Sequence, residues 1–403
     1  MRESIKDKVA IVGMGCTKFG ERWNMGIEDL IVEAASEALE DANVDIKDIQ
    51  AIWLGTWQGS QPFEAALTTG ILVSSTLQTQ NIPVTRIENA CATGQDALRG
   101  AALGVASKVY DLVLVIGVDK LKDVGFGGLG SMYPGRGEVV YGAFGTPPGR
   151  YAMAAIAYFR KYGLTPEEGK RMLAEIDVKS HYYGARNPKA HLKKEITVEE
   201  AMNAPVIAWP LGLYDCCGVT DGASAAILCP AQEARRYRDD YVTIKGLGLA
   251  ASPGWGKERD DYDFTWWDST EAAAHQAYDE AGIKDPRKEL DIVECHDCFS
   301  IAELIGTESL LLCDEGQYKQ QISDKRAYYK DGGMPVNISG GLKAFGHPLG
   351  ASGCREVYEV YKQIQGKAQD PSRQIKNVEL GLTHSQGGHP GRFVCSVCLI
   401  GSP

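Results

Sequence analysis

The chain has 403 residues, 44% of them hydrophobic and 24% charged, which is typical of a soluble globular protein with two or three domains or one duplicated domain. Its formal net charge of −11 argues against nucleic acid as a main partner, although helix N-termini and local basic groups can still bind a phosphate-bearing ligand. No apolar run approaches the roughly 20 residues of a membrane span, and the odd count of 11 cysteines predicts reduced thiols in the cytoplasm.

The N-terminal part of the chain alternates between strand and helix patterns. "VAIVGMG" at residues 9–15 reads as a strand and a turn, and residues 27–44 have the apolar spacing of a helix. Residues 84–107, "VTRIENACATGQDALRGAALGVAS", predict a short strand that runs into Cys91 and a Gly/Ala-rich helix that follows it. Residues 111–119 are apolar on both faces, as expected of a central buried strand. This alternation is typical of an α/β fold.

A glycine-rich stretch at residues 125–137 opens an insert. The insert carries a helix pattern at residues 151–163, and it ends with "DGASAAIL" at residues 221–228, which reads as a turn into a buried strand. Two further strand patterns, "YVTIKGLGLA" and "RFVCSVCLIG", follow later in the chain.

The segments on either side of this insert resemble one another. Residues 27–44 and 270–283 are both helix patterns that lead through a polar link and the letters "DI" into a strand. "CATGQDALRGAA" also resembles "GASGCREVYEV", with Gly94 matching Gly353. We therefore predict a duplicated α/β protein whose insert ends in a strand of the N-terminal half. The predicted parts are residues 1–124, 125–241 and 242–403.

Cys91 occupies the junction between a strand and a helix. At such a junction the helix dipole and the free N–H groups of the first turn stabilise a thiolate, which predicts a lowered pKa and a reactive thiol. Ala92 and Gly94 are small enough for a ligand to approach the backbone. A purely structural cysteine is the alternative, because most cysteines at helix starts are small buried fillers.

Three histidines follow in segments that read as loops beside buried strands. His296 lies in "VECHDCFSIAEL", His347 in "NISGGLKAFGHPLGASG" and His384 in "LTHSQGGHPGRF". In open α/β folds such loops form the ligand crevice. This placement favours a shared site over three unrelated surface residues.

Two cysteine pairs raise the question of a metal site. "CHDC" and "CSVC" both have the C-x-x-C spacing, but they lie too far apart in the sequence for a zinc ribbon. "CSVC" also sits in an apolar run that reads as a buried strand. We therefore predict no metal site.

Together these segments resemble the thiolase superfamily. "ENACATGQDAL" is similar to its nucleophile segment, "NISGGLKAFGHPLGASG" to its signature around a G-H-P histidine, and "DGASAAIL" to a further family segment. "HDCFSIAEL" replaces the N-E-A-F of ordinary degradative thiolases and is similar to the sterol-carrier-protein thiolases and their archaeal and bacterial relatives. "THSQGGHPG" replaces the usual C-x-G segment, so the second family cysteine is absent. The resemblance implies two similar α/β halves, stacked as a layered αβαβα structure with a loop-rich insert.

The resemblance also implies a reaction on a 3-oxoacyl-CoA. Cys91 would attack the carbonyl at C3, and His347 would take the proton of the thiol. The leaving group would be a thioester enolate, whose oxygen His296 and His347 would stabilise. Free CoA would then remove the acyl group from the cysteine.

Two further roles follow from the replaced C-terminal segment. An oxyanion hole for the acyl group would use the backbone N–H of Cys91 and one from the segment that contains Gly387 and Gly388. The enolate needs a proton donor, and His384 and Cys298 are the candidates. We favour His384, because it begins the segment that replaces the family's cysteine motif.

The resemblance implies coenzyme A as a substrate, no covalently bound cofactor, and a homodimer with residues 82–87 near the subunit interface. Members of this branch work with a separate small OB-fold protein that carries a zinc ribbon. Because no zinc ribbon is encoded here, a partner chain is expected.

The substrate is indicated only by stretches that could line a pocket: "GTWQGSQPFEAAL", "GFGGLGSMYPGRG" and "DYDFTWWDST". They suit an aromatic substrate such as benzoylsuccinyl-CoA. Two alternatives stay open: a condensing enzyme of the ketoacyl or hydroxymethylglutaryl synthase type, and a non-catalytic lipid-transfer or scaffold protein. A non-catalytic protein would be expected to lack some of Cys91, His296 and His347, and all three are present.

Overall fold

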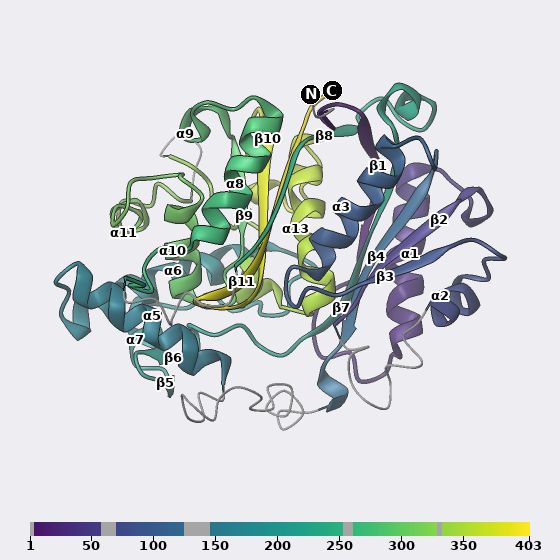
Figure 1. The fold of residues 1–403 in the computed structure, drawn as a ribbon. Helices are drawn as coiled ribbons and strands as arrows, with labels where there is room; N and C mark the ends of the chain where they lie inside the picture. The colour runs from purple at the N-terminus through teal and green to yellow at the C-terminus, as the bar shows by residue number, and fades with distance from the viewer. Residues whose placement is uncertain (1–3, 58–69, 125–145, 253–260, 329–332) are drawn as a thin grey trace.

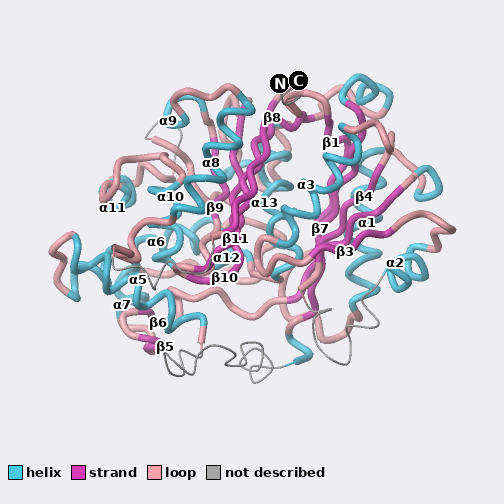
Figure 2. Tube along the Cα trace, in the orientation of Figure 1, coloured by secondary structure: helices cyan, strands magenta, loops and turns pink. Residues whose placement is uncertain are grey.

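The structure is a computed structural model that describes residues 4–57, 70–124, 146–252, 261–328 and 333–403 (Figure 1). Strands and helices alternate through both ends of the chain, with a mainly helical stretch between them (Figure 2). Within the described ranges, no helix combines the length and the apolar character that a membrane span needs.

The N-terminal half follows the predicted alternation of strands and helices. Helix α1 (Ile27–Ala42) forms because its apolar residues recur on one face, which is buried. Asp29 accepts a hydrogen bond from the backbone N–H of Gly26 at its start (2.8 Å), and Asn43, with φ 53°, ends it. In chain order the elements are β1 (Val9–Cys16), α1 (Ile27–Ala42), β2 (Ala51–Gly55), α2 (Gly70–Leu77), β3 (Val84–Ile87), α3 (Thr93–Ala106) and β4 (Val113–Lys120).

The described part of the insert is mostly helical, whereas the resemblance implied a loop-rich insert, and it ends in a strand. Its longest helix starts with a capping box, in which the Thr165 hydroxyl accepts from Glu168 N (3.2 Å) and the Glu168 carboxylate accepts from Thr165 N (2.8 Å). The elements are α5 (Pro147–Lys161), α6 (Pro166–Arg186), α7 (Val198–Met202), β5 (Val206–Ala208), β6 (Leu211–Gly212) and β7 (Asp221–Pro230).

The C-terminal half repeats the plan of the first half and adds short helices. Helix α8 (Asp268–Ala281) is capped by Gly282, whose φ of 80° suits a residue without a side chain. The elements are β8 (Val242–Ala251), α8 (Asp268–Ala281), α9 (Pro286–Glu289), β9 (Ile292–Cys295), α10 (Ser300–Ser309), α11 (Tyr318–Ser323), α12 (Gly341–Phe345), α13 (Leu349–Ile364), β10 (Leu380–His389) and β11 (Arg392–Gly401).

The strand order confirms that the two halves are similar. The large sheet runs β3-β2-β4-β7-β1-β8-β11-β10-β9. In the first half β2 is parallel to β4, and β4 is antiparallel to β7. In the second half β9 is parallel to β10, and β10 is antiparallel to β11. Val336 forms a parallel bridge with Val293 of β9. It thus occupies beside β9 the position that β3 occupies beside β2 in the first half. The exact boundaries between the predicted parts remain predictions.

Two helices lie between the half-sheets. β1 and β8 pair only at Ala10↔Thr243 and Ile11↔Val242, so the half-sheets meet along a short seam. α13 packs on α3 and touches strands of both halves, including β4, β7, β9 and β10. α1 covers the outer face of the first half-sheet, and α8 covers that of the second (Figure 1). This is the layered αβαβα arrangement that the sequence indicated, and it brings the starts of α3 and α13 together.

Candidate active site

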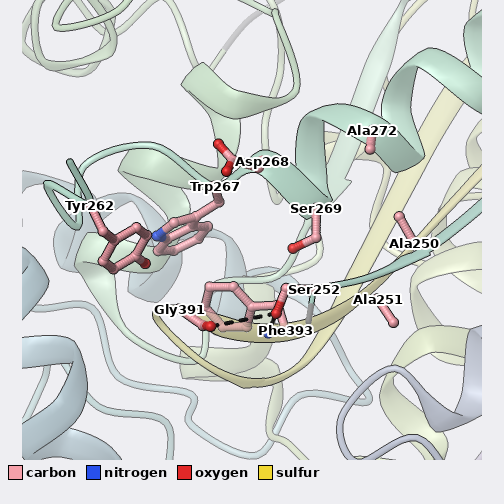
Figure 3. A pocket seen from close by; sticks show the side chains of 10 residues that line it. All are labelled: Ala250, Ala251, Ser252, Tyr262, Trp267, Asp268, Ser269, Ala272, Gly391 and Phe393. Carbon is pink, nitrogen blue, oxygen red and sulfur yellow. Dashed lines mark hydrogen bonds between the residues drawn. The ribbon is translucent and has the colours of Figure 1, made fainter. Parts of the chain in front are cut away.

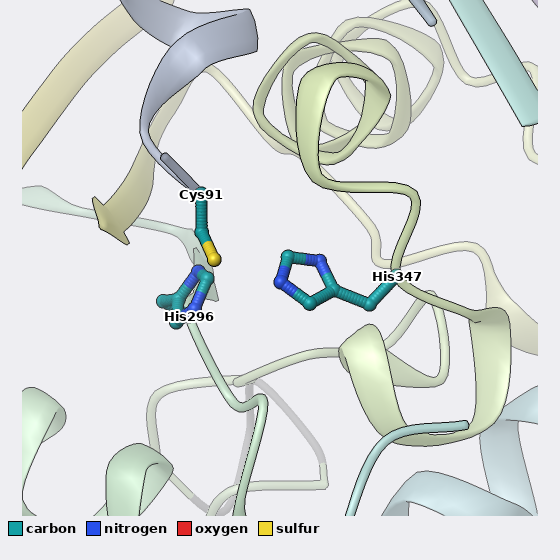
Figure 4. Close-up of side chains that lie close together, drawn as sticks. All are labelled: Cys91, His296 and His347. Carbon is teal, nitrogen blue, oxygen red and sulfur yellow. The ribbon is translucent and has the colours of Figure 1, made fainter. Parts of the chain in front are cut away.

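Three of the predicted residues meet at one point. The Cys91 sulfur, one ring nitrogen of His296 and one ring nitrogen of His347 all lie within 4.8 Å of one another. The cysteine comes from the turn before α3, and the histidines come from the loops after β9 and before α13 (Figure 4). Residues far apart in the sequence thus form one cluster because the carboxyl ends of β3 and β9 and the start of α13 converge.

The turn that carries Cys91 is tightly held. Ala90 adopts φ 49°, a conformation that is uncommon for residues other than glycine. Thr93 fixes the turn, because its hydroxyl accepts from Asn89 N (2.8 Å) and donates to Ala90 O (2.5 Å). Gly387 of β10 lies directly behind, where a Cβ would come within 3.0 Å of Cys91 N and 2.3 Å of Asn89 O. Only glycine lets β10 approach the nucleophile turn this closely.

The environment of Cys91 opposes ionisation of the thiol. Burial is the largest cause and the Asp119 carboxylate the next, and together with smaller contributions they raise the pKa of Cys91 to about 12. The expectation of a lowered pKa is therefore wrong for the free protein, because desolvation and a neighbouring negative charge outweigh the start of α3. The thiol needs a base before it can act as a nucleophile.

His347 has the tautomer that a base requires. The Ser352 hydroxyl uses its hydrogen to donate to Pro348 O (2.8 Å). Its oxygen lies 2.7 Å from His347 Nδ1 and therefore accepts a hydrogen bond from the Nδ1–H. Nε2 then carries a lone pair, and no other described residue hydrogen-bonds to it. Burial, with the Arg355 charge, lowers the pKa of His347 to about 3, which keeps the ring neutral near pH 7.

His296 lies beside this base with its polar atoms unused. Its ring is fully buried, its centroid is 5.1 Å from that of His347, and the two planes meet at 79°. Neither ring nitrogen has a hydrogen-bond partner among the described residues. Burial, and then the neighbouring histidines, hold the pKa of His296 well below its usual value. A buried N–H without a partner is available to an oxygen of a bound ligand.

His384 does not lie in a loop, as the sequence suggested, but inside β10. It pairs with Val397 across β11 and with Cys295 along β9, because the glycines after it continue the strand opposite β11. Its ring is fully buried near His296, and burial lowers its pKa to about 3. It is not among the residues that line the cavity at Cys91.

Cys298 and Gly388, in contrast, line the same cavity as Cys91. The Cys298 thiol contacts the hydroxyl of Tyr151 from α5, which also accepts from Gln386 Nε2 (3.4 Å). The cavity has a volume of about 250 Å³ and a largely apolar wall. The remaining lining residues are Leu121, Pro147, Pro148, Ile207, Leu213, Cys216, Cys217, Gly218, Val219, Phe299, His347 and Leu349.

The third aromatic stretch named from the sequence does not line this cavity in its described residues. Tyr262 and Trp267, from the third stretch, line a second cavity together with Phe393 and Ser269 (Figure 3). Trp267 and Phe393 both pack against Tyr151, with ring centroids 6.3 Å from its ring, so aromatic side chains separate the two cavities. The second stretch and most of the first fall outside the described residues.

Several residues of the site went unnoticed in the sequence. Tyr151 lies on a helix of the insert, and nothing in the local pattern connects it with Cys298. Ser352 and Asp119 carried a detectable signal: Ser352 is five residues after His347, and Asp119 ends a buried strand at the edge where parallel strands place ligand sites.

The cluster can support nucleophilic chemistry. A thiol, a neutral imidazole with a free lone pair and a second buried imidazole are the parts of a cysteine nucleophile with a base and an oxyanion stabiliser. Thiolate and neutral imidazole are also ligands that Zn²⁺ accepts, so the same atoms could hold a soft cation.

The sequence and the fold are both similar to known proteins. Residues 9–128 match the thiolase N-terminal domain, and residues 257–397 match a C-terminal domain described as thiolase-like. The chain is 38% identical over 385 residues to an acetyl-CoA acetyltransferase of Methanothermobacter thermautotrophicus, covering 95% of this chain and 97% of the relative. It is 34% identical over 389 residues to the benzoylsuccinyl-CoA thiolase subunit BbsB of Thauera aromatica, covering 95% and 96%. The solved structure of an Ltp2–ChsH2 (DUF35) aldolase shares the fold over 99% of both chains, with a TM-score of 0.82 and 21% identity.

Proposed function

The chain belongs to the thiolase family and is an acyltransferase, and from this premise we propose that it cleaves a 3-oxoacyl-CoA with free CoA through an acyl-enzyme on Cys91. The observation that carries the proposal is the cluster of Cys91, His296 and His347, in which Cys91 and His347 line one apolar cavity and His296 lies beside them. By microscopic reversibility the same residues serve the condensation of two acyl-CoA molecules.

The first half-reaction follows from the protonation states of the cluster. His347 Nε2 takes the proton of Cys91 as the sulfur attacks the C3 carbonyl of the substrate. The bond between C2 and C3 then breaks, leaving the acyl group on Cys91 and the electron pair on a thioester enolate. His296 and the newly protonated His347 donate hydrogen bonds to the enolate oxygen. The backbone N–H groups of Cys91 and Gly388 are suited to the oxyanion formed at C3.

The enolate needs a proton at carbon, and we assign that proton to Cys298 rather than to His384. Cys298 shares the cavity with Cys91, whereas His384 lies within β10 behind His296. Burial holds the pKa of Cys298 well above its usual value, so it is a thiol near pH 7. Cys298 would give its proton to the enolate and recover one from the incoming CoA thiol. The CoA thiolate would then take the acyl group from Cys91, which regains its proton from His347.

We further propose that the protein works as a homodimer with a small partner chain. Among the strands of the described residues β3 is the last of the large sheet, and an edge strand of this kind can pair with a second copy. The solved structure with the same fold at a TM-score of 0.82 is a complex with a DUF35 chain, which supports a partner in this branch of the family. Coenzyme A is the substrate that the family implies.

For the acyl group, the relatives offer two substrates. The archaeal relative is an acetyl-CoA acetyltransferase, which suggests acetoacetyl-CoA, and the Thauera relative is a benzoylsuccinyl-CoA thiolase subunit. Both are compatible with a largely apolar cavity of about 250 Å³, and an aromatic ring would pack against Tyr151 and Phe299, whose ring centroids are 4.5 Å apart.

The test is to purify the protein with any small chain that co-purifies and to screen 3-oxoacyl-CoA esters with free CoA. We expect CoA-dependent cleavage, with a burst of the first acyl-CoA product when free CoA is limiting. Cys91→Ser, a nearly isosteric change, should abolish cleavage without affecting the fold. Cleavage that persists in Cys91→Ser, or no cleavage of any ester by the folded complex, would contradict the proposal.

A further inference from the structure

Asp119 connects three parts of the active-site framework. It is the second-last residue of β4, and its side chain is fully buried. The carboxylate accepts hydrogen bonds from the Thr56 hydroxyl (2.9 Å) and Trp57 N (3.0 Å) after β2, and from Gly350 N (2.6 Å) in the first turn of α13. A carboxylate can accept all three, whereas an amide side chain has only one acceptor oxygen.

The start of α13 fits this position because the neighbouring residues are glycines. A Cβ on Gly350 would come within 2.7 Å of Gly55 O and 2.9 Å of Thr56 Cα. A Cβ on Gly117 of β4 or on Gly94 of α3 would come within 2.3 Å or 2.4 Å of Gly350 O. Backbone therefore packs directly against backbone where α3, α13 and β4 meet, and small displacements are not absorbed by side chains.

The contact of α3, α13 and β4 sets the position of His347 relative to Cys91. Gly94 lies three residues after the cysteine in α3, and Gly350 lies three residues after the histidine in α13. The hydrogen bond from Gly350 N to Asp119 draws the start of α13 onto the ends of β2 and β4. Any loosening of that bond moves His347 relative to the sulfur that it must deprotonate.

We propose that Asp119 is a positioning residue that holds the first turn of α13, and through it His347, at its working distance from Cys91. The inference rests on the proposed function for the role of His347 as the base. In this role Asp119 acts through its hydrogen bond to Gly350 N (2.6 Å) in α13.

The charge of Asp119 has a separate, measurable consequence. It is the second cause, after burial, of the raised pKa of Cys91. Removing the charge while keeping the shape therefore makes the free thiol easier to ionise, even as the base is displaced. Turnover and reactivity of the free thiol should change in opposite directions, which simple damage to the site would not produce.

Asp119→Asn is the main test, and Thr56→Val is the matched control because it removes one donor and retains the charge. We expect Asp119→Asn to lower kcat by about 10- to 100-fold, the size expected of a displaced catalytic group, with KM changed by less than about threefold. Its alkylation by iodoacetamide at pH 8 should be faster than that of wild type by about threefold to tenfold, allowing for the lower nucleophilicity of a more acidic thiol. Thr56→Val should lower kcat by about threefold to tenfold and should not accelerate alkylation.

An Asp119→Asn protein with wild-type kcat, or with slower turnover but unchanged alkylation, would overturn the proposal. If Asp119→Asn does not fold, Thr56→Val decides, since an unchanged kcat in that variant would contradict the positioning role. Alkylation is measured without any acyl-CoA, so it remains informative if no substrate is found. A wild-type protein that alkylates at Cys91 but cleaves no ester would count against the proposed function and not against the link between Asp119 and Cys91.

Discussion

Replacing Ser352 with alanine removes the group that sets the tautomer of His347. In the wild type the Ser352 hydroxyl donates to Pro348 O (2.8 Å) and accepts from His347 Nδ1 (2.7 Å), and both side chains are buried. Without the hydroxyl, the Nδ1–H has no acceptor, which costs about 1–3 kcal/mol for a buried donor. The ring can avoid this cost by moving its proton to Nε2, but Nε2 then cannot accept the proton of Cys91.

Either outcome slows the attack on the substrate. A penalty of about 2 kcal/mol corresponds to a loss of about 30-fold in kcat, and a complete change of tautomer costs up to about 10⁴-fold in serine hydrolases that depend on the same kind of base. We therefore expect Ser352→Ala to lower kcat by at least about 30-fold, with little change in KM.

Steady-state thiolysis measures these effects. Ser224→Ala is the matched control, because the Ser224 hydroxyl is also buried and donates to a carbonyl of α13, that of Ala351 (2.7 Å), without touching His347. It should stay within about threefold of wild type, since it removes an ordinary hydrogen bond away from the cluster. Equal losses of activity in Ser352→Ala and Ser224→Ala would refute the tautomer argument.

Three further predictions concern the other histidines and the proton donor. His296→Ala should leave alkylation of Cys91 unchanged yet cost about 2.7–4 kcal/mol in the chemical step, the size expected of one oxyanion donor; slower alkylation would contradict its assignment. Exchange of the α-protons of acetyl-CoA with deuterium should be lost in Cys298→Ala and retained in His384→Ala, and the reverse pattern would restore His384 as the acid. Burial lowers the pKa of His384 to about 3. Between about pH 6.5 and 3 the unfolded state therefore binds a proton that the folded state does not. The free energy of unfolding then falls by up to about 1.4 kcal/mol for each pH unit of acidification. His384→Leu should reduce that slope in urea unfolding at pH 6.5 and 5, and an unchanged slope would show that the ring is not buried and neutral.

Local sequence patterns were sufficient to identify the parts of the fold that depend on short-range features. The strand and helix around Cys91 follow from an apolar run and a Gly/Ala-rich helix pattern, and the duplication follows from two matching segments. The grouping of Cys91, His296 and His347 could be anticipated because each follows or precedes an element at the same edge of a parallel arrangement.

What the sequence could not supply are interactions between distant segments. The two glycines after His384 predict a loop, but they pair with Val394 and Phe393 of β11 and continue the strand. The start of a helix predicts an activated thiol at Cys91, but Asp119, which opposes the ionisation, comes from a strand elsewhere in the chain. The contact between Cys298 and Tyr151 likewise depends on where α5 packs, and no short pattern records that.

The most direct test of the account is to locate the acyl group on the protein. Incubation with a 3-oxoacyl-CoA in the absence of free CoA, followed by rapid quenching, proteolysis and mass spectrometry, identifies the acylated residue. We predict one acyl group, on the peptide that contains Cys91, which is released by added CoA and does not form in Cys91→Ser. An acyl group on another cysteine, such as Cys298 or Cys217, or an adduct that forms equally in Cys91→Ser, would contradict the central claim.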